Sequence, residues 1–335
     1  MPVVLLALML LSLPVVAQDQ QFADLGSCAL ESGERIEACR IGYRTFGALS
    51  EARDNAILIP TWFSGTSEAW VELQAQLLGA EHDHFVIVVD ALANGVSVSP
   101  SNSRAQAGAA FPEITTRDMV RSQYRLLREV LELDRLHAVM GVSMGGMQAF
   151  EWGVLYPGFM RKLIPIAGSP KLAAYDVALW ETYKALLELG EACRCARAAR
   201  AIRGLFFLTG ASPRLRNATV EPGAVPERIR SATAEQFGTG RSLDLIRQAD
   251  AMIATDVSRA FSGDWRAAAA AVQARALVIV SSSDHVVTPG AATRFAELLG
   301  ERSTLIEFAN DCGHGIPACE MFRSRALIRE FLRGA

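Results

Sequence analysis

The sequence predicts an α/β fold: a mostly parallel central sheet with flanking helices and a helical lid insertion. Short apolar runs alternate along the chain with longer helix-like stretches, and this alternation is typical of a doubly wound sheet. Most runs are continuous and rich in Ile, Val and Leu. Strands have this composition when helices bury both of their faces. One long stretch lacks such runs, which indicates an insertion between two strands.

Seven segments have the character of strands. Residues 38–47, ACRIGYRTFG, alternate apolar and polar side chains, as a strand with one exposed face does. The continuous apolar runs are residues 56–60, 85–90, 136–141, 162–168, 276–282 and 304–309. Helices are predicted at residues 68–78, 116–133, 144–156, 291–299 and 319–332. Thr115 or Thr116, just before RDMV, is expected to cap the second of these helices.

Residues 171–271 contain no convincing buried strand. They are rich in Ala and Arg and are interrupted by TGASPRLRNATVEPGAVP. We expect them to form a helical lid, inserted into a core that consists of residues 18–170 and 272–335.

The chain begins with an apolar stretch, MPVVLLALMLLSLPVVAQDQ, which has no charged side chain before Asp19. Its apolar part, Pro2 to Ala17, is shorter than the roughly 20 residues that cross a bilayer, and the small residue Ala17 ends a predicted cleavage site. Residues 1–17 are therefore predicted to be a signal peptide of a secreted or periplasmic protein. No stable membrane association is expected after cleavage. An uncleaved anchor is the alternative, because no Lys or Arg precedes the stretch.

Six cysteines fit an oxidising compartment. Cys28 and Cys39 flank a predicted hairpin, and pairing Ser32 with Arg35 places the two cysteines opposite each other. A disulfide between them is therefore predicted. The alternative for all six cysteines is that they are small buried apolar residues.

A second disulfide is predicted between Cys312 and Cys319, which would close a small loop around His314. Cys193 and Cys195 are not expected to pair, because side chains two residues apart on a helix point away from each other.

The bulk composition excludes some classes of function. Of the 335 residues, 50% are hydrophobic and 21% are charged, and the formal net charge is −3. The sequence has no basic stripe of the kind that binds nucleic acid, so nucleic acid is not an expected partner. His82 and His84 form an H-x-H pair, but no third ligand is evident and no zinc-type cysteine spacing occurs. No metal and no cofactor are expected.

Residues 141–148, GVSMGGMQ, lie between an apolar run and an apolar helix. A G-x-S-x-G motif at such a junction indicates a nucleophile elbow, in which a sharp strand-to-helix turn exposes the serine. Ser143 is the predicted nucleophile. The alternative is that Gly145 and Gly146 only allow close packing between helix and sheet.

A serine nucleophile needs a base and a group that orients the base. Asp284 and His314 each follow a predicted strand, in the order Ser, Asp, His that this fold uses. Catalytic groups gather at the carboxyl ends of strands in such sheets, so Asp284 and His314 are predicted to complete a triad with Ser143. Asp311 is too close to His314 in sequence to orient it.

An oxyanion hole needs two backbone N–H groups. Met144 follows the nucleophile and is the first predicted donor, and Phe63 is the second, with Trp62 as the alternative. Trp62, Phe63 and Trp70 are predicted to form an aromatic wall that binds substrate. They would otherwise be ordinary core residues.

Three stretches resemble the homoserine O-acetyltransferase family of the α/β-hydrolase superfamily. They are GVSMGGMQAFEWGVLYP, IGYRTFGALSEARDNAILIP and FPEITTRDMVRSQYRLLREVLEL; SSSDHVVTP and the closing CGH extend the likeness. The resemblance implies an acylated Ser143, a triad with Asp284 and His314, and a helical lid over a tunnel. Family members often form homodimers through lid helices.

Departures from the family pattern bear on the substrate. Gly315 follows His314 where the acyltransferases typically have an aspartate that holds the amino group of homoserine, and TWFSG replaces their usual H-A-L-T-G. Lys184 is the nearest candidate for an arginine that the family presents from its lid, and it is therefore predicted to bind substrate.

The resulting hypothesis is an exported hydrolase that acts on an ester or related small acyl compound, with water as the acyl acceptor. The alternatives are an O-acyltransferase that uses acetyl-CoA, and a non-catalytic binding protein.

Overall fold

The computed structural model describes residues 19–233 and 241–334. The predicted signal peptide, residues 1–17, lies outside these ranges and stays a prediction. Among the helices of the described ranges, none is long and apolar enough to cross a membrane.

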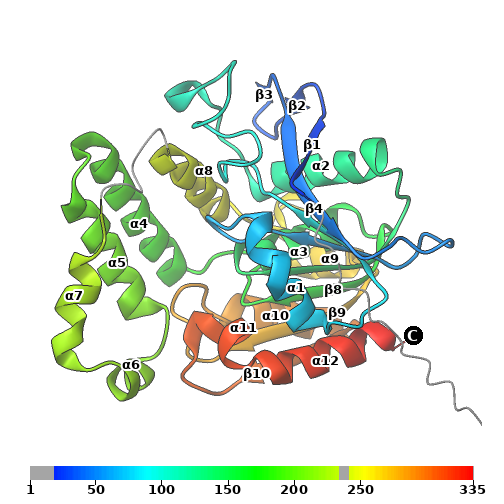
Figure 1. Ribbon diagram of the computed structural model, residues 1–335. Helices are drawn as coiled ribbons and strands as arrows, with labels where there is room; N and C mark the ends of the chain where they lie inside the picture. The colour runs from blue at the N-terminus through cyan, green and yellow to red at the C-terminus, as the bar shows by residue number, and fades with distance from the viewer. Residues whose placement is uncertain (1–18, 234–240, 335) are drawn as a thin grey trace, which may run out of the picture.

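The described chain forms an eight-stranded sheet in the order β1-β4-β6-β5-β7-β8-β9-β10 (Figure 1). β4 runs antiparallel to both of its neighbours, and the other pairs are parallel. The predicted α/β fold with a mostly parallel sheet is therefore confirmed. The strands are β1 (Gln21–Asp24), β4 (Arg40–Phe46), β5 (Ala56–Pro60), β6 (Phe85–Val89), β7 (Leu136–Val142), β8 (Met160–Ile166), β9 (Arg275–Ser281) and β10 (Ser303–Phe308). β1 was not among the predicted strands.

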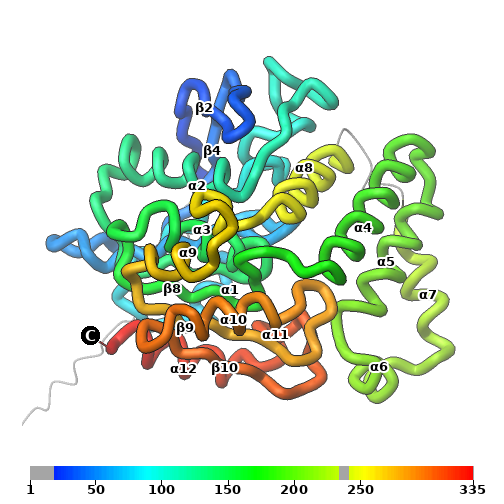
Figure 2. The backbone as a smooth tube through the Cα atoms, turned by 180° about the vertical axis from the view of Figure 1, so that it is seen from behind, coloured from blue at the N-terminus to red at the C-terminus, as the bar shows by residue number. Residues whose placement is uncertain are grey.

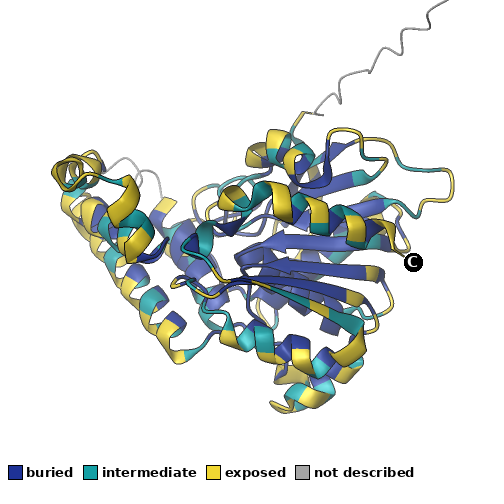
Figure 3. Cartoon of the chain, turned by 90° about the horizontal axis from the view of Figure 1, so that it is seen from below, coloured by how far each residue is buried: buried dark blue, intermediate teal, exposed yellow. Residues whose placement is uncertain are grey.

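Helices cover both faces of the sheet, and Figure 3 shows the strands buried between them. Successive residues of a strand point to opposite faces, so Leu58 belongs to one hydrophobic cluster while Ile57 and Ile59 belong to the other. The helices of the first layer are α2 (Thr116–Arg125), α3 (Met144–Leu155), α9 (Trp265–Ala271) and α10 (Gly290–Leu299). The second layer consists of α1 (Trp70–Leu78) and α12 (Met321–Arg333).

α2 begins where the sequence predicts. The Thr115 side chain accepts a hydrogen bond from the backbone of Asp118, and the Asp118 carboxylate accepts one from the backbone of Thr115, so the two residues form a capping box. The predicted helix over 116–133 is shorter in the structure, because the α-helix ends at Arg125 and a π-helical turn, Leu126–Val130, follows.

A helical insertion lies between β8 and β9. Its helices are α4 (Ala174–Cys193), α5 (Ala196–Thr209), α6 (Pro213–Thr219), α7 (Val225–Arg230) and α8 (Arg241–Ile253). Figures 1 and 2 show α4 to α7 on one side of the sheet, with α8 between them and the core. α9, at the end of the range predicted as lid, packs instead against α3 and α10 of the core.

Three cysteine pairs lie at disulfide-bonding distance: Cys28–Cys39, Cys193–Cys195 and Cys312–Cys319. The first and third are the predicted pairs. The prediction that Cys193 and Cys195 stay apart is wrong. α4 ends at Cys193, Arg194 adopts a left-handed conformation with φ 47°, and Cys195 occupies the extended N-cap position before α5. The two side chains therefore do not share one helix, and the helical-spacing argument does not apply to them.

The predicted hairpin register is also wrong. The hairpin forms from β2 (Cys28–Ala29) and β3 (Arg35–Ile36), but Cys28 pairs with Ile36 in the ladder. Cys39 lies beyond β3, where its N–H donates to the carbonyl of Gly26 and its carbonyl accepts from the N–H of Leu25. The chain after β3 thus folds back toward the start of β2, which brings Cys39 to Cys28 without a ladder pair.

Candidate active site

Ser143 occupies a sharp turn between β7 and α3. Its backbone has φ 56° and ψ −122°, a conformation that is strained for a residue with a side chain. A Cβ at Gly141 would lie 2.1 Å from the carbonyl oxygen of Gly145, and a Cβ at Gly145 would lie 2.4 Å from that of Pro60. Both glycines are therefore required for the turn to pack against the sheet, and together they hold the serine at the carboxyl end of β7.

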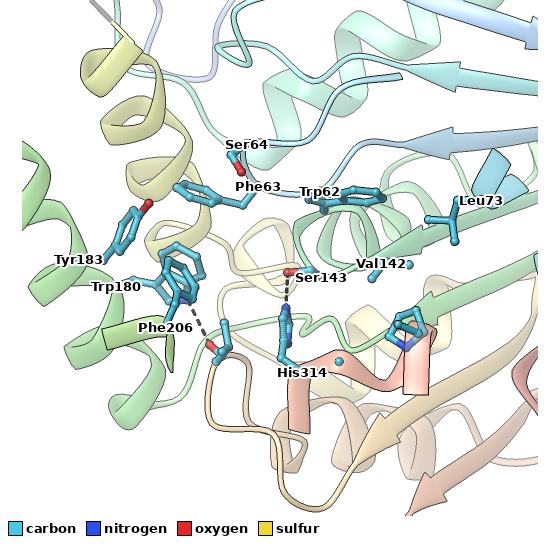
Figure 4. A pocket seen from close by; sticks show the side chains of 14 residues that line it. Trp62, Phe63, Ser64, Leu73, Val142, Ser143, Trp180, Tyr183, Phe206 and His314 are labelled. Atoms are coloured by element: carbon cyan, nitrogen blue, oxygen red, sulfur yellow. Dashed lines mark hydrogen bonds between the residues drawn. The ribbon is translucent and has the colours of Figure 1, made fainter. Parts of the chain in front are cut away.

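Ser143, His314 and Asp284 form a continuous hydrogen-bonded line (Figure 4). His314 Nε2 lies 2.8 Å from Ser143 Oγ, and His314 Nδ1 lies 2.7 Å from Asp284 Oδ2. The residues are 171 and 30 positions apart in the chain, and the structure brings all three predicted triad members together. An imidazole between a hydroxyl and a carboxylate can accept the hydroxyl proton while the carboxylate orients the ring.

Asp284 is held by the backbone that follows it. Its Oδ1 accepts hydrogen bonds from the N–H groups of Val286 and Val287, at 2.8 and 3.0 Å, which leaves Oδ2 for His314. The side chain is buried, with the residue 2% exposed. The Asp284 carboxylate is thus fixed in one orientation.

The loop that carries His314 is packed at both ends. Gly313 adopts φ 58°, and a Cβ there would lie 2.8 Å from the Cα of Ala211. Past His314, the short helix α11 (Ile316–Cys319) ends at the cysteine that bridges back to Cys312. The small loop predicted around His314 is therefore present.

A cavity of about 360 Å³ opens over Ser143 and His314. Trp62 and Phe63 lie on one side of Ser143, and His314 lies on its other side (Figure 4). Aromatic side chains of the insertion close one end of the cavity. The cavity is lined by Trp62, Phe63, Ser64, Leu73, Val142, Ser143, Trp180, Tyr183, Phe206, Val286, His314, Gly315, Pro317 and Ala318. Among these described lining residues there is no Asp, Glu, Lys or Arg, so they offer no fixed charge to a ligand.

Two residues predicted to bind substrate lie away from the cavity. Trp70 is fully buried behind Trp62, with ring centroids 5.4 Å apart, and does not line the cavity. Lys184 pairs with Glu181 and Asp250, at 3.0 and 3.1 Å. Burial opposes the charge of Lys184, but its hydrogen bonds with both carboxylates outweigh this effect and raise its pKa. Its ammonium group is therefore already neutralised by protein carboxylates.

The predicted oxyanion donors have free N–H groups. Met144 is the first residue of α3, where a helical N–H has no intrahelical acceptor. Within the described ranges, the backbone N–H groups of Met144, Trp62 and Phe63 have no hydrogen-bond acceptor. They remain the predicted donors to an oxygen that develops negative charge beside Ser143.

Sequence reasoning missed the aromatic residues of the insertion. Trp180 and Tyr183 lie on α4 and Phe206 on α5, with ring centroids 5.6 Å apart for Trp180 and Tyr183 and 5.1 Å apart for Tyr183 and Phe206. Burial raises the pKa of the Tyr183 hydroxyl, which keeps it neutral. The i, i+3 spacing of Trp180 and Tyr183 places them on one helix face and was the available signal.

The fold and the hydrogen-bonded line define a class: a doubly wound α/β protein with a serine, a histidine and an aspartate at the carboxyl edge of its sheet. Residues 55–317 match the model of the alpha/beta hydrolase fold family. The chain belongs to this family, and its relatives include esterases and homoserine O-acetyltransferases.

Three relatives illustrate the range of the family. A probable esterase of Corynebacterium glutamicum is 38% identical over 173 residues, which cover 50% of this chain and 49% of the esterase. The chain thus matches about half the length of that relative. A homoserine O-acetyltransferase of Symbiobacterium thermophilum is 28% identical, with 96% of each chain covered. The crystal structure of an acetylester hydrolase from C. glutamicum superposes with a TM-score of 0.81 at 28% identity, covering 94% of this chain and 95% of the hydrolase.

Proposed function

We propose that the chain is a serine hydrolase of small, uncharged esters, with Ser143, His314 and Asp284 as its catalytic triad. The hydrogen-bonded line from Ser143 Oγ to Asp284 carries this proposal. An acetylester hydrolase among the structural relatives supports a short acyl group.

The reaction follows from the positions of the three side chains. Ser143 Oγ bonds to the ester carbonyl carbon while its proton moves to His314 Nε2, and Asp284 stabilises the imidazolium. The N–H groups of Met144 and Phe63 stabilise the resulting oxyanion. The carbon–oxygen bond to the alcohol then breaks, and the imidazolium gives its proton to that alcohol. Water attacks the acyl-enzyme in the same way, so that the acid leaves and Ser143 regains its proton.

The apolar cavity favours an uncharged substrate and water as the acceptor. A site that binds an amino acid needs a charged partner for its ammonium group, because a buried unpaired charge is costly. The described residues that line the cavity include no carboxylate, and a Cβ at Gly315 would meet nothing within 4 Å. The space beside His314 is therefore open rather than filled by a substitute acidic group.

The second candidate function is O-acyl transfer, which the full-length similarity to a homoserine O-acetyltransferase supports. It uses the same acyl-enzyme with another acceptor. Export from the cytoplasm is also part of the proposal, supported by three cysteine pairs at disulfide-bonding distance.

The test is hydrolysis of p-nitrophenyl acetate by the purified protein, together with labelling by a fluorophosphonate probe. Ser143→Ala is expected to abolish both, while Ser122→Ala, at a buried serine bonded to the carbonyl of Met119, is expected to retain both. Activity that survives Ser143→Ala, or a wild-type chain that the probe does not label, would contradict the proposal. Product that forms from acetyl-CoA only when homoserine is present would favour the transferase instead.

A further inference from the structure

The loop that follows β5 is held at two points by buried glutamine side chains. Gln148 of α3 donates from Nε2 to the carbonyl of Thr61 at 3.2 Å, and Gln248 of α8 accepts from the N–H of Ser64 at 2.8 Å. Both glutamines are fully buried. Trp62 and Phe63, which carry the free N–H groups beside the cavity, lie between these two attachment points.

Gln148 also reaches the other side of the predicted oxyanion hole. Its Nε2 donates a second hydrogen bond, of 3.1 Å, to the carbonyl of Met144. One amide group therefore connects the loop that carries Phe63 to the helix terminus that carries Met144. Gln248 donates in turn to the carbonyl of Leu92 at 3.2 Å, so the loop is attached to the core on that side as well.

A tryptophan fixes the orientation of the Gln148 amide. The indole Nε1 of Trp152 can only donate, and it donates to Gln123 Oε1 at 2.8 Å. Gln123 therefore presents its Nε2, which donates to Gln148 Oε1 at 2.6 Å. The Nε2 of Gln148 must then face the carbonyls of Thr61 and Met144, because the reverse orientation would oppose donor to donor and acceptor to acceptor.

We propose that Gln148 and Gln248 are positioning residues that set the distance between the two oxyanion donors, Met144 and Phe63. Such donors stabilise a transition state only when they are held at hydrogen-bonding distance from the developing charge, and a misplacement of about 1 Å can cost roughly 100-fold in rate. This inference rests on the proposed function. It also gives α8, a helix of the insertion, a part in catalysis, because α8 supplies Gln248.

The experiment compares Gln148→Met and Gln248→Met with the wild type. Methionine keeps the length of the side chain but has no amide group. We expect kcat for p-nitrophenyl acetate to fall about 100-fold in Gln148→Met and about 10-fold in Gln248→Met, with KM changed by less than about 3-fold. The matched control is Gln74→Met, at a buried glutamine of α1 that bonds the carbonyl of Val71 and the ring of His82. Its kcat is expected to stay within about 2-fold.

A second measurement separates positioning from a general loss of structure. A trifluoromethyl ketone forms a tetrahedral adduct with the serine whose oxyanion occupies the donor site. Its inhibition constant is expected to rise in parallel with the loss of kcat, whereas the affinity of the corresponding unreactive methyl ketone stays unchanged. Each variant's melting temperature reports whether it is folded.

The possible results distinguish a positioning role of the two glutamines from a purely structural one. Folded Gln148→Met and Gln248→Met variants with wild-type kcat and inhibitor affinity would overturn the inference, while probe labelling of Ser143 would still support the proposed function. If Gln148→Met does not fold, Gln248→Met and Gln123→Met decide, since the latter leaves Gln148 in place but removes the group that orients it. Loss of affinity for both ketones alike would show a structural role and would also refute the inference.

Discussion

The orientation of Asp284 allows a sharp prediction for Asp284→Asn. The substituted residue has one oxygen in place of two, and the N–H groups of Val286 and Val287 both need an acceptor at the Oδ1 position. The asparagine oxygen is therefore expected to stay with these two donors, and its NH₂ group to face His314 Nδ1. A donor at that position requires Nδ1 to be unprotonated, which moves the imidazole proton to Nε2.

A proton on Nε2 faces Ser143, so His314 can no longer accept the serine proton. The fold and the line of side chains remain, but the tautomer is the wrong one. Such a change lowers kcat about 10⁴-fold in a Ser-His-Asp triad. At 1.36 kcal/mol for each factor of ten, this corresponds to about 5.5 kcal/mol of activation free energy.

The assay is kcat for p-nitrophenyl acetate, with the rate of fluorophosphonate labelling as a second readout. The matched control is Asp311→Asn. This carboxylate lies three residues before His314 but bonds Ser212 and Arg214 rather than the imidazole, and its substitution is expected to change kcat by less than about 3-fold. An Asp284→Asn variant that keeps more than a tenth of the wild-type kcat would refute the reasoning, as would an equal loss in Asp311→Asn.

Two further predictions concern the insertion. Phe206→Ala removes a wall of the cavity and is expected to raise the ratio of kcat/KM for p-nitrophenyl hexanoate to that for p-nitrophenyl acetate about 10-fold. The ring of Phe207 lies against Arg216 outside the cavity lining, so Phe207→Ala is expected to leave that ratio unchanged. An unchanged ratio in Phe206→Ala would show that the Phe206 ring does not limit chain length. Burial raises the pKa of Asp244 from 3.8 to about 6, against its hydrogen bonds with Ser101, so the folded state binds this proton more tightly than the unfolded state. The protonated Asp244 carboxyl therefore stabilises the folded state, and this stabilisation is fully present below pH 3.8 and is lost as the pH rises through 6. As the pH rises from 4 to 7.5, the unfolding free energy of Asp244→Asn is therefore expected to gain up to about 3 kcal/mol relative to wild type. Urea titration of both proteins at the two pH values measures this change. A difference in unfolding free energy between variant and wild type that stays the same at both pH values would contradict the raised pKa.

Much of the site was accessible from the sequence because its signals are local. A glycine pair around Ser143 marks a turn that tolerates no side chain, as the close approach of Gly145 to Pro60 shows. Asp284 and His314 each follow an apolar run, and parallel strands place their carboxyl ends at one edge. Chain order and strand ends were thus sufficient to select three residues among many candidates.

The rest depended on partners far away in sequence. Lys184 was predicted to bind substrate, but its ammonium group pairs with the carboxylate of Asp250, which lies 66 residues later in the chain. Trp70 was predicted to be part of the aromatic wall, yet it is buried behind Trp62 and does not line the cavity. Neither outcome leaves a pattern in the local sequence, because each is decided by which helix packs beside which.

The sequence by itself determined the class of fold, the sharp turn at Ser143 and the chain order of Ser143, Asp284 and His314, since apolar periodicity and glycine requirements act over a few residues. Only the tertiary structure decided the hairpin register, the aromatic end of the cavity and the attachment of Ser64 to Gln248, 184 residues away. Hydrogen bonds and ring contacts of this kind form between surfaces that meet only after the chain has packed, so their partners are fixed by the relative placement of whole elements.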